Sequence, residues 1–404
     1  MNTLNYKRIL VGISGGIAAY KSADLVRRLR ELGADVRVAM TRSACEFITP
    51  LTMQAVSGKP VHLELLDHAI ESGMGHIELA RWCDVVLIAP ASANFMARVA
   101  QGLADDLLTT ICLATTAPVY MAPAMNREMW LNDATQHNAG LLQQRGISLL
   151  GPGTGEQACG ETGPGRMLEP EQLIAGLQSL FQTQELASRK LLITAGPTRE
   201  YIDPVRYISN RSSGRMGYAV AHAALEAGAS VTLVSGPVNL ELPEYADCVQ
   251  VTTAGEMYRA VMQRISGCDI FISAAAVADY SCTNIAGSKI KKSDTDLSLK
   301  LDRNPDILAA VAATKPPPFT VGFAAETDNL LENARQKLTG KKLDMIAANQ
   351  VGDELGFDSE ENELHLLWQN GEKLLSRASK AKLARELIHI VAEQFNKGNS
   401  APAN

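Results

Sequence analysis

The sequence lacks three features that would place it in a specialised class of protein. Its seven cysteines are scattered with no CxxC pair, which argues against a zinc site or a disulfide framework and favours reduced thiols. No apolar run is long enough to cross a bilayer, and the first residues show no signal-peptide pattern. Basic residues are not in excess, since the net charge is −6. We therefore expect a cytoplasmic protein with neither a nucleic-acid nor a membrane partner.

The length and composition predict a globular chain of two domains. The chain has 404 residues, of which 46% are hydrophobic and 20% charged. An amphipathic helix is predicted over 170–181, and the polar stretch 182–189 after it is a plausible linker. We place the domains at 1–189 and 190–404. The tail from Gln394 is rich in small and polar residues, so we expect it to be disordered.

Both halves begin with the same series of elements. Each has an apolar strand that ends in a glycine turn, a helix stopped by glycine, and a second strand. Later, "CDVVLIAPASAN" in the first half is echoed by "CDIFISAAAVAD" in the second. The order predicts βαβ units and two Rossmann-like α/β domains. The elements are expected at 8–14, 18–32 and 35–40, and again at 190–196, 213–226 and 230–235.

The first half contains a glycine turn at 14–21 that suits phosphate. The turn joins a strand to a helix N-terminus, where backbone N–H groups and the helix dipole favour an anion. It is not GxGxxG, and Thr41 stands where a dinucleotide site would place an acid, so a mononucleotide fits better than NAD. Residues 90–94 and 102–110 are further candidate ligand loops. Each of these segments alone is also explained as a tight connection or a capped helix start.

Three more segments carry residue types used in catalysis. Gly75-His76 precedes a short helix, residues 123–130 read PAMNREMW after a strand, and the glycine-rich segment 153–165 surrounds Cys159. A lone His, Asn or Cys is more often structural. Together, however, they resemble the flavin-containing cysteine decarboxylases, through the PxMNxxMW motif, the active-site His and the flap Cys of that family. The family motif PASANT reads PASANF here, with Phe95 in the last place.

This resemblance implies a flavodoxin-like domain that binds FMN. In the family's reaction His76 would act as the base, Asn126 would orient the carboxylate of the substrate, and Cys159 would donate a proton. The positions expected to contact FMN are Gly15, Gly16, Ile17, Ala18, Thr41, Ser92, Asn94, Ala104, Asp105 and Asp106.

The second half has a long polar loop over 194–217 that leads into a helix. It contains Arg206, Arg211 and Arg215, a concentration that indicates an anionic ligand in a net-acidic chain. A lysine run follows at 289–292, and Asp279 after a buried strand is a candidate for a metal ion or ribose hydroxyls. The alternative is a solvated loop and a solvated lysine face.

The segments "ITAGPTREYIDPVRYISNRSSGRMG", "AAAVADY", "KIKK", "NPDIL" and "GFAAET" resemble the phosphopantothenate–cysteine ligase domain. The resemblance implies a doubly wound domain that joins cysteine to 4'-phosphopantothenate with CTP and Mg²⁺, through an acyl-cytidylate. Asn210 and Lys289 would serve catalysis, and Asp279 would hold the metal ion. Nucleotide contacts are implied at Ala274, Ala275, Ala276, Asp279, Lys289, Asn304, Pro305, Asp306, Ile307, Phe323, Lys337 and Lys341.

Taken together, the two halves resemble the bifunctional bacterial family of coenzyme A synthesis, whose members form homo-oligomers up to dodecamers. Two other classes of function stay open. A flavin-binding regulatory subunit without chemistry is opposed by the joint presence of His76, Asn126 and Cys159. A nicotinamide-dependent reductase is opposed by Thr41.

Overall fold

The computed structural model describes residues 4–65, 75–158, 160–291, 297–326, 329–350 and 361–400. The chain divides into two compact units, Met1–Phe181 and Gln182–Asn404. Each unit has hydrophobic clusters of its own. Within the described ranges, no helix is both long and apolar enough to span a bilayer.

The first unit alternates strands and helices along the chain. Its elements are β1 (Arg8–Ile13), η1 (Ile17–Ala19), α1 (Tyr20–Glu31), β2 (Asp35–Met40), α2 (Arg42–Cys45), α3 (Pro50–Ser57), β3 (Val61–His62), α4 (Gly75–Trp82), β4 (Val85–Ala91), α5 (Ala93–Ala100), α6 (Leu107–Ala114), β5 (Val119–Pro123), α7 (Arg127–Leu131), α8 (Asp133–Gln144), β6 (Ser148–Leu149), β7 (Gly153–Glu156), β8 (Thr162–Arg166) and α9 (Pro170–Phe181).

The main sheet of the first unit has the order β3-β2-β1-β4-β5-β6, and all neighbouring strands are parallel. Without the two-residue edge strand β3, the remaining five strands follow the flavodoxin-like order, as predicted. The order reverses between β1 and β4. The loops that follow these two strands therefore meet at the edge where open α/β sheets bind ligands.

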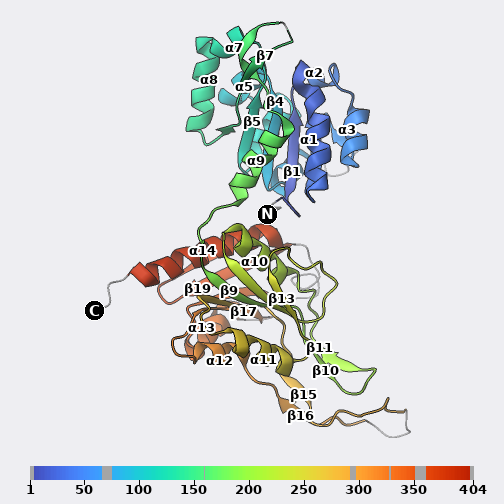
Figure 1. Cartoon of the computed structure of the whole chain (residues 1–404), viewed down its shortest axis with the longest axis vertical. Helices are drawn as coiled ribbons and strands as arrows, with labels where there is room; N and C mark the ends of the chain where they lie inside the picture. The colour runs from blue at the N-terminus through green and yellow to red at the C-terminus, as the bar shows by residue number, and fades with distance from the viewer. Residues whose placement is uncertain are drawn as a thin grey trace. The chain divides into compact units, whose positions relative to one another are not determined.

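Helices cover both faces of this sheet (Figure 1). Helices α1, α3 and α9 pack on one face, and α4, α5, α6 and α8 pack on the other. Side chains of a strand alternate between faces, so Ile9, Val11 and Ile13 of β1 join the first layer while Leu10 joins the second. A strand buried on both sides needs the continuous apolar run that the sequence shows.

The second unit repeats this alternation. Its elements are β9 (Lys190–Ala195), β10 (Arg199–Tyr201), β11 (Tyr207–Ser209), α10 (Arg215–Glu226), β12 (Ser230–Ser235), β13 (Asp247–Gln250), α11 (Ala254–Arg264), β14 (Ile270–Ser273), β15 (Tyr280–Cys282), β16 (Leu301–Arg303), α12 (Ile307–Ala312), β17 (Phe319–Glu326), α13 (Leu330–Gly340), β18 (Met345–Gln350), β19 (Glu361–Trp368), β20 (Gly371–Ser379) and α14 (Lys380–Ser400).

The large sheet of this unit has the order β13-β12-β9-β14-β17-β18-β19-β20. Its first six strands are parallel and follow the Rossmann order, which confirms the predicted doubly wound domain. The hairpin β19–β20 adds two antiparallel strands at one edge. Helices α10 and α14 cover one face, and α11, α12 and α13 cover the other (Figure 1). Two short ribbons, β10–β11 and β15–β16, extend beyond the sheet.

The C-terminal segment differs from its prediction. The expectation of disorder from Gln394 is wrong for the described part, because α14 continues to Ser400. Phe395 is 8% exposed, packs edge-to-face on Phe319 at 6.1 Å, and lies under the guanidinium of Arg189. The apolar face of the helix therefore runs past the point where the composition turns polar.

The polar segment 182–189 packs on the second unit. Leu186 is fully buried in the cluster that contains α10 and α14, and its N–H donates to the carbonyl of Ala227. The segment therefore contributes to the core of the second unit.

Candidate active sites

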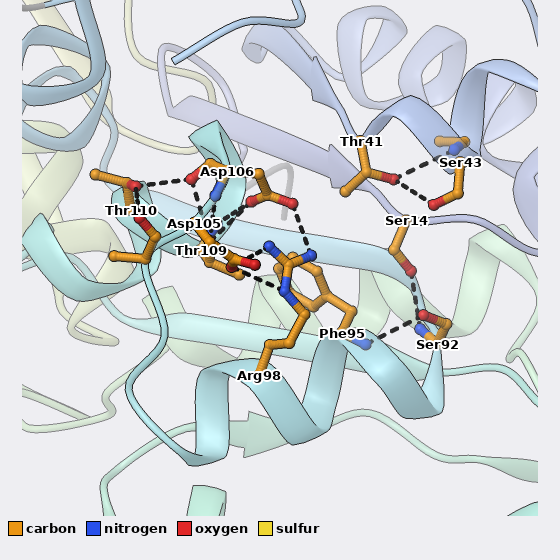
Figure 2. Close-up of polar contacts among 12 residues, drawn as sticks. Ser14, Thr41, Ser43, Ser92, Phe95, Arg98, Asp105, Asp106, Thr109 and Thr110 are labelled. Carbon is orange, nitrogen blue, oxygen red and sulfur yellow. Dashed lines mark hydrogen bonds and ion pairs between the residues drawn. The ribbon is translucent and has the colours of Figure 1, made fainter.

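At the reversal point of the first sheet, a buried serine joins the two loops. The Ser14 hydroxyl donates to the carbonyl of Pro90 and accepts from the N–H of Ser92, both at 2.8 Å (Figure 2). Ser92 in turn caps α5 by accepting from the N–H of Phe95 at 3.3 Å. The loops after β1 and β4 thus form one continuous edge. Our sequence-based site did not include Ser14, although a hydroxyl between a buried strand and a Gly-Gly pair was the available signal.

In the glycine turn, the backbone at Gly15 lies close to Ser43, whereas the backbone at Gly16 has open space beside it. A Cβ on Gly15 would lie 2.6 Å from Cβ of Ser43, so only glycine lets the two loops approach. A Cβ on Gly16 would meet nothing within 4 Å. The turn η1 starts here with Gly16 as its N-cap, so the N–H groups of Ile17 and Ala18 receive no side-chain cap from that residue. This edge suits a phosphate group.

Thr41 follows β2 and caps α2. Its hydroxyl accepts from the N–H of Ala44 at 3.2 Å and lies 3.1 Å from the hydroxyl of Ser43. The residue is 7% exposed and carries no charge. A carboxylate that could bind two ribose hydroxyls is therefore missing from this position.

The predicted acidic positions are held by an arginine (Figure 2). Asp106 caps α6 through the N–H of Thr109 at 2.8 Å and accepts from Arg98 at 2.8 Å. Arg98 also pairs with Asp105, and its hydrogen bond holds the pKa of that carboxyl below the usual value. The carbonyl of Ala104 accepts from Thr110 at 3.2 Å. Arg98 therefore engages both carboxylates and offsets one of their two negative charges.

Asn94 and Phe95 are adjacent residues on α5 but lie in different environments. Asn94 lies exposed on the first turn of the helix. Phe95 is 1% exposed and belongs to the cluster under α5, α6 and α8. The departure from the family motif at Phe95 therefore falls on a core position.

His76 is the second residue of α4, which packs against α6. Its ring nitrogen Nδ1 is buried and has no hydrogen-bond partner among the described residues. Buried polar atoms are normally satisfied, so an unpartnered imidazole nitrogen points to a functional role. It can accept a proton or a hydrogen bond from a ligand.

Asn126 lies between β5 and α7 with its amide fixed at both ends. Its Oδ1 accepts from the N–H of Glu128 at 2.8 Å, and its Nδ2 donates to the Glu161 carboxylate at 2.7 Å. Glu161 belongs to the hairpin β7–β8, which is bound to this segment through Met125 N–H and Gly165 O at 2.9 Å. The predicted Cys159 stands between residues 156 and 162 in the sequence and lies outside the described residues.

In the second unit, the loops after β11 and β14 meet. The amide of Asn210 donates to the carbonyl of Val277 at 3.2 Å, and the amide of Asn304 donates to that of Ala278 at 2.8 Å. The N–H of Ala274 donates to the carbonyl of Thr194 in β9, and the N–H of Ala276 donates to the carbonyl of Gly196 just after β9. Ala275 bonds to the hydroxyl of Thr194 at 3.3 Å. Predicted residues from distant parts of the chain therefore gather at one edge.

A cavity of about 460 Å³ opens beside Asn210. Arg199, Arg211 and Arg215 line it, whereas Arg206 lies outside this lining. Arg199 was not singled out from the sequence, although it stands in the quoted TRE segment. Three guanidinium groups around one cavity suit an anionic ligand.

The predicted nucleotide lysines lie on α13 and at its end. Lys337 pairs with Glu326 at 2.5 Å, and Lys341 pairs with Asp306 at 2.7 Å. Asp306, which follows Pro305, also caps α12. The first residue of that helix, Ile307, is buried. These lysines and Glu326 line a cavity of about 370 Å³. Phe323 on the neighbouring β17 is half-buried.

Lys289 and Asp279 are both exposed. Within the described ranges, no group of three or more His, Cys, Asp or Glu side chains is placed to hold a metal ion. A magnesium ion held by one carboxylate and by substrate phosphates does not require such a group.

Comparison with known proteins shows the same division of the chain. The Flavoprotein family matches residues 1–182, and the DNA/pantothenate metabolism flavoprotein C-terminal domain matches residues 186–395. The coenzyme A biosynthesis bifunctional protein CoaBC of Vibrio vulnificus (strain YJ016) is 57% identical over 392 residues, which cover 96% of this chain and 98% of that protein. The protein of that name from Escherichia coli (strain K12) is 53% identical over 399 residues, covering 97% and 98%.

Among solved structures, the FMN-dependent cysteine decarboxylase SpaF is 32% identical, covers 43% of this chain and 95% of that chain, and has a TM-score of 0.39. The two relatives above match over almost their whole length and that of this chain. The chain therefore belongs to the family of bifunctional coenzyme A biosynthesis proteins, CoaBC, with a flavoprotein half followed by a C-terminal half of the pantothenate-metabolism type.

Proposed function

We propose that the chain performs two consecutive reactions of coenzyme A synthesis. The second unit joins cysteine to 4'-phosphopantothenate with CTP and Mg²⁺, through an acyl-cytidylate and with release of pyrophosphate. The first unit then decarboxylates the product to 4'-phosphopantetheine with FMN. The observation that carries this proposal is the match of one family to each half of the chain. In each unit, polar groups also gather at the loops that follow the parallel strands.

In the first unit, the turn from Gly15 to Ala18 would hold the phosphate of FMN, with Ser92, Asn94 and the segment 104–106 beside it. The open side at Gly16 and the uncapped start of η1 fit such a group. When bound, FMN supplies reversible hydride transfer. His76 would take a proton from the substrate, because its buried Nδ1 is unpartnered within the described residues.

Asn126 would hold the carboxylate that is lost as CO₂. The contact between its amide nitrogen and Glu161 supports this role, since the Glu161 carboxylate stands in for that of the substrate. The N–H of Glu128 holds Oδ1 of Asn126, which leaves the amide N–H groups as donors for a carboxylate. Cys159 would donate the final proton from the hairpin that packs on this segment.

In the second unit, the cavity beside Asn210 would take an anionic part of the substrates. The segment 274–279, with residues 304–307, Phe323, Lys337 and Lys341, would bind CTP, and Asp279 would hold Mg²⁺ together with the phosphates. Lys289 would stabilise the negative charge that develops on the phosphate during acyl transfer. Asn210 would orient the acyl group.

We further propose that the protein works in the cytoplasm as a homo-oligomer, up to a dodecamer. Light scattering of the purified protein tests the assembly, and a monomer in solution would contradict it.

The test of the proposed function is product analysis with 4'-phosphopantothenate, cysteine and either CTP or ATP. We expect cysteine-dependent consumption of CTP, release of pyrophosphate and formation of 4'-phosphopantetheine by a yellow protein. A yellow protein that forms no product would instead be a regulatory flavin-binding subunit. A colourless protein that consumes NADPH would be a nicotinamide-dependent reductase.

A further inference from the structure

Lys289 lies on an exposed segment, yet the backbone of the next residue is held on both sides. The N–H of Ile290 donates to Oδ2 of Asp203 at 3.1 Å. Its carbonyl accepts from the guanidinium of Arg206 at 2.9 Å. Asp203 and Arg206 are far from Ile290 in the sequence, yet their side chains bind both its backbone N–H and its backbone carbonyl. Ile290 lies in a segment that forms neither helix nor strand.

The pair that makes these bonds, Asp203 and Arg206, is itself held by several hydrogen bonds. Asp203 is fully buried in the turn between β10 and β11. Its Oδ1 accepts from the N–H groups of Val205 and Arg206, each at 2.8 Å, and its Oδ2 accepts from Nε of Arg206 at 3.0 Å. The hydrogen bond with Arg206 holds the pKa of the Asp203 carboxyl well below its usual range. The Asp203 carboxyl is therefore ionised at neutral pH.

The same ribbon leads directly to Asn210. Strand β11 ends at Ser209, and the amide of the next residue, Asn210, bonds to Val277. At the turn, the carbonyl of Ile202 accepts from the N–H of Ala286 at 3.0 Å. Asn210 therefore directly follows the ribbon β10–β11, and the turn of the same ribbon holds the segment that contains Lys289.

We propose that Asp203 is a positioning residue of the ligase site, which fixes the backbone at Ile290 and thereby places Lys289 for ligation. The inference rests on the proposed function of the second unit. A lysine has a long, flexible side chain, so its charge reaches a defined place only if its backbone is held. Loss of such placement by about 1 Å typically costs on the order of 100-fold in rate.

The test compares Asp203→Asn with the full-length protein. Asparagine keeps the size of the side chain and one acceptor oxygen, but its amide nitrogen is a donor and can accept neither from Ile290 nor from Arg206. Asp247→Asn is the matched control, because Asp247 is exposed on the edge strand β13. Two quantities are measured, namely the steady-state kinetics of ligation and the rate of tryptic cleavage after Lys289.

We expect Asp203→Asn to lower kcat of ligation by about 10- to 100-fold with KM for cysteine nearly unchanged. Cleavage between Lys289 and Ile290 should become faster, since proteolysis follows local opening of the backbone. Decarboxylation of supplied phosphopantothenoylcysteine should stay at the wild-type level. The control should match the wild type in all three measurements.

Two outcomes would overturn the inference. If kcat falls while cleavage after Lys289 is unchanged, Asp203 does not act through Ile290. If cleavage becomes faster while kcat is unchanged, holding the segment does not serve ligation. Should Asp203→Asn fail to fold, Ile290→Pro removes the N–H donor and leaves the pair of Asp203 and Arg206 intact. That variant should show the same loss of kcat, and full activity would refute the inference. A wild-type protein without ligation would instead defeat the proposed function.

Discussion

At the scale of residues, the proposed FMN site is formed by the loops after β1, β2 and β4 and by the start of α6. Most polar side chains of this site are engaged with the protein's own backbone. Ser14 joins two loops, while Thr41, Ser92 and Asp106 each cap a helix. What these residues leave for a ligand is backbone N–H groups at the turn from Gly15. Their side chains shape the edge, whereas His76 and Asn126 are the groups with atoms suited to a substrate.

Cys159→Ser separates the two proposed reactions. A serine hydroxyl is a far weaker acid than a thiol, so the variant should stop after the substrate has been oxidised. The proposed ligation with CTP belongs to the other unit, which has a core of its own, so it should stay within about twofold of the wild type. The measurement is the ratio of pyrophosphate released to 4'-phosphopantetheine formed. Equal amounts of both products in the variant would refute the role of Cys159 as proton donor.

Phe95→Thr restores the residue of the family motif and tests whether this position faces the core. Because Phe95 is 1% exposed among apolar neighbours, we expect a loss of about 3 kcal/mol in the stability of the first unit. The cap by Ser92 uses the backbone N–H of this residue and should persist. Denaturant unfolding followed by flavin release measures the effect, with Phe95→Leu as the milder control. Weaker flavin binding without loss of stability would instead place the side chain at the ligand.

At the scale of elements, a buried lysine ties α1 to the start of α9. Lys21 is 6% exposed and donates to Glu169 at 2.8 Å and to the carbonyl of Met167 at 3.1 Å. Glu169 also accepts from Arg166, at the end of the hairpin strand β8. These bonds therefore fix the base of the hairpin β7–β8 to α1, the helix that follows the glycine turn.

Glu169→Gln should weaken this tie in a pH-dependent way. The hydrogen bond with Lys21 lowers the pKa of Glu169 below 4.5, so its contribution is present above about pH 4.5 and is lost as the pH falls through the lowered value. We expect a loss of about 1 kcal/mol at pH 7, because the carboxylate is partly exposed. The difference from the wild type should shrink toward pH 3, as followed by thermal unfolding of the first unit.

Glu171→Gln is the control for this pair of helices. Glu171 bonds to Arg28 of α1 at 2.9 Å, but both side chains are exposed at the surface. Its loss should change stability by less than about 0.5 kcal/mol. A Glu169 variant that loses no more than this, or whose loss does not depend on pH, would show that the tie is not electrostatic.

At the scale of the whole molecule, the two units have separate cores, and Leu186 belongs to the second. We expect the fragments 1–181 and 182–404 each to fold, and we expect calorimetry of the intact chain to show two unfolding transitions. The fragment 190–404 should be less stable than 182–404 by at least about 2 kcal/mol, because it lacks the buried Leu186. Equal stability of the two C-terminal fragments would place the boundary at 189, as the polarity of the segment suggests.

The local patterns of the sequence were sufficient for the parallel part of each sheet. Continuous apolar strands, glycine stops and helix periodicity depend on neighbours within a few residues, so the βαβ units of both halves could be predicted from them. They failed at the C-terminal helix, where composition turned polar but Phe395 still packs on Phe319. The hairpin β19–β20 was not anticipated either, because its pairing adds strands at a sheet edge rather than completing a βαβ unit.

By itself, the sequence determined the fold class, the two halves and the residue types available for chemistry. Only the tertiary structure decided which of them meet and how they are held. The amide of Asn126 faces a carboxylate, Arg98 pairs with both Asp105 and Asp106, and Asp203 holds the backbone beside Lys289. Each of these contacts joins segments that sheet topology or a loop brings together. Side-chain hydrogen bonds act over about 3 Å in space, whatever the separation along the chain, so no local pattern announces them.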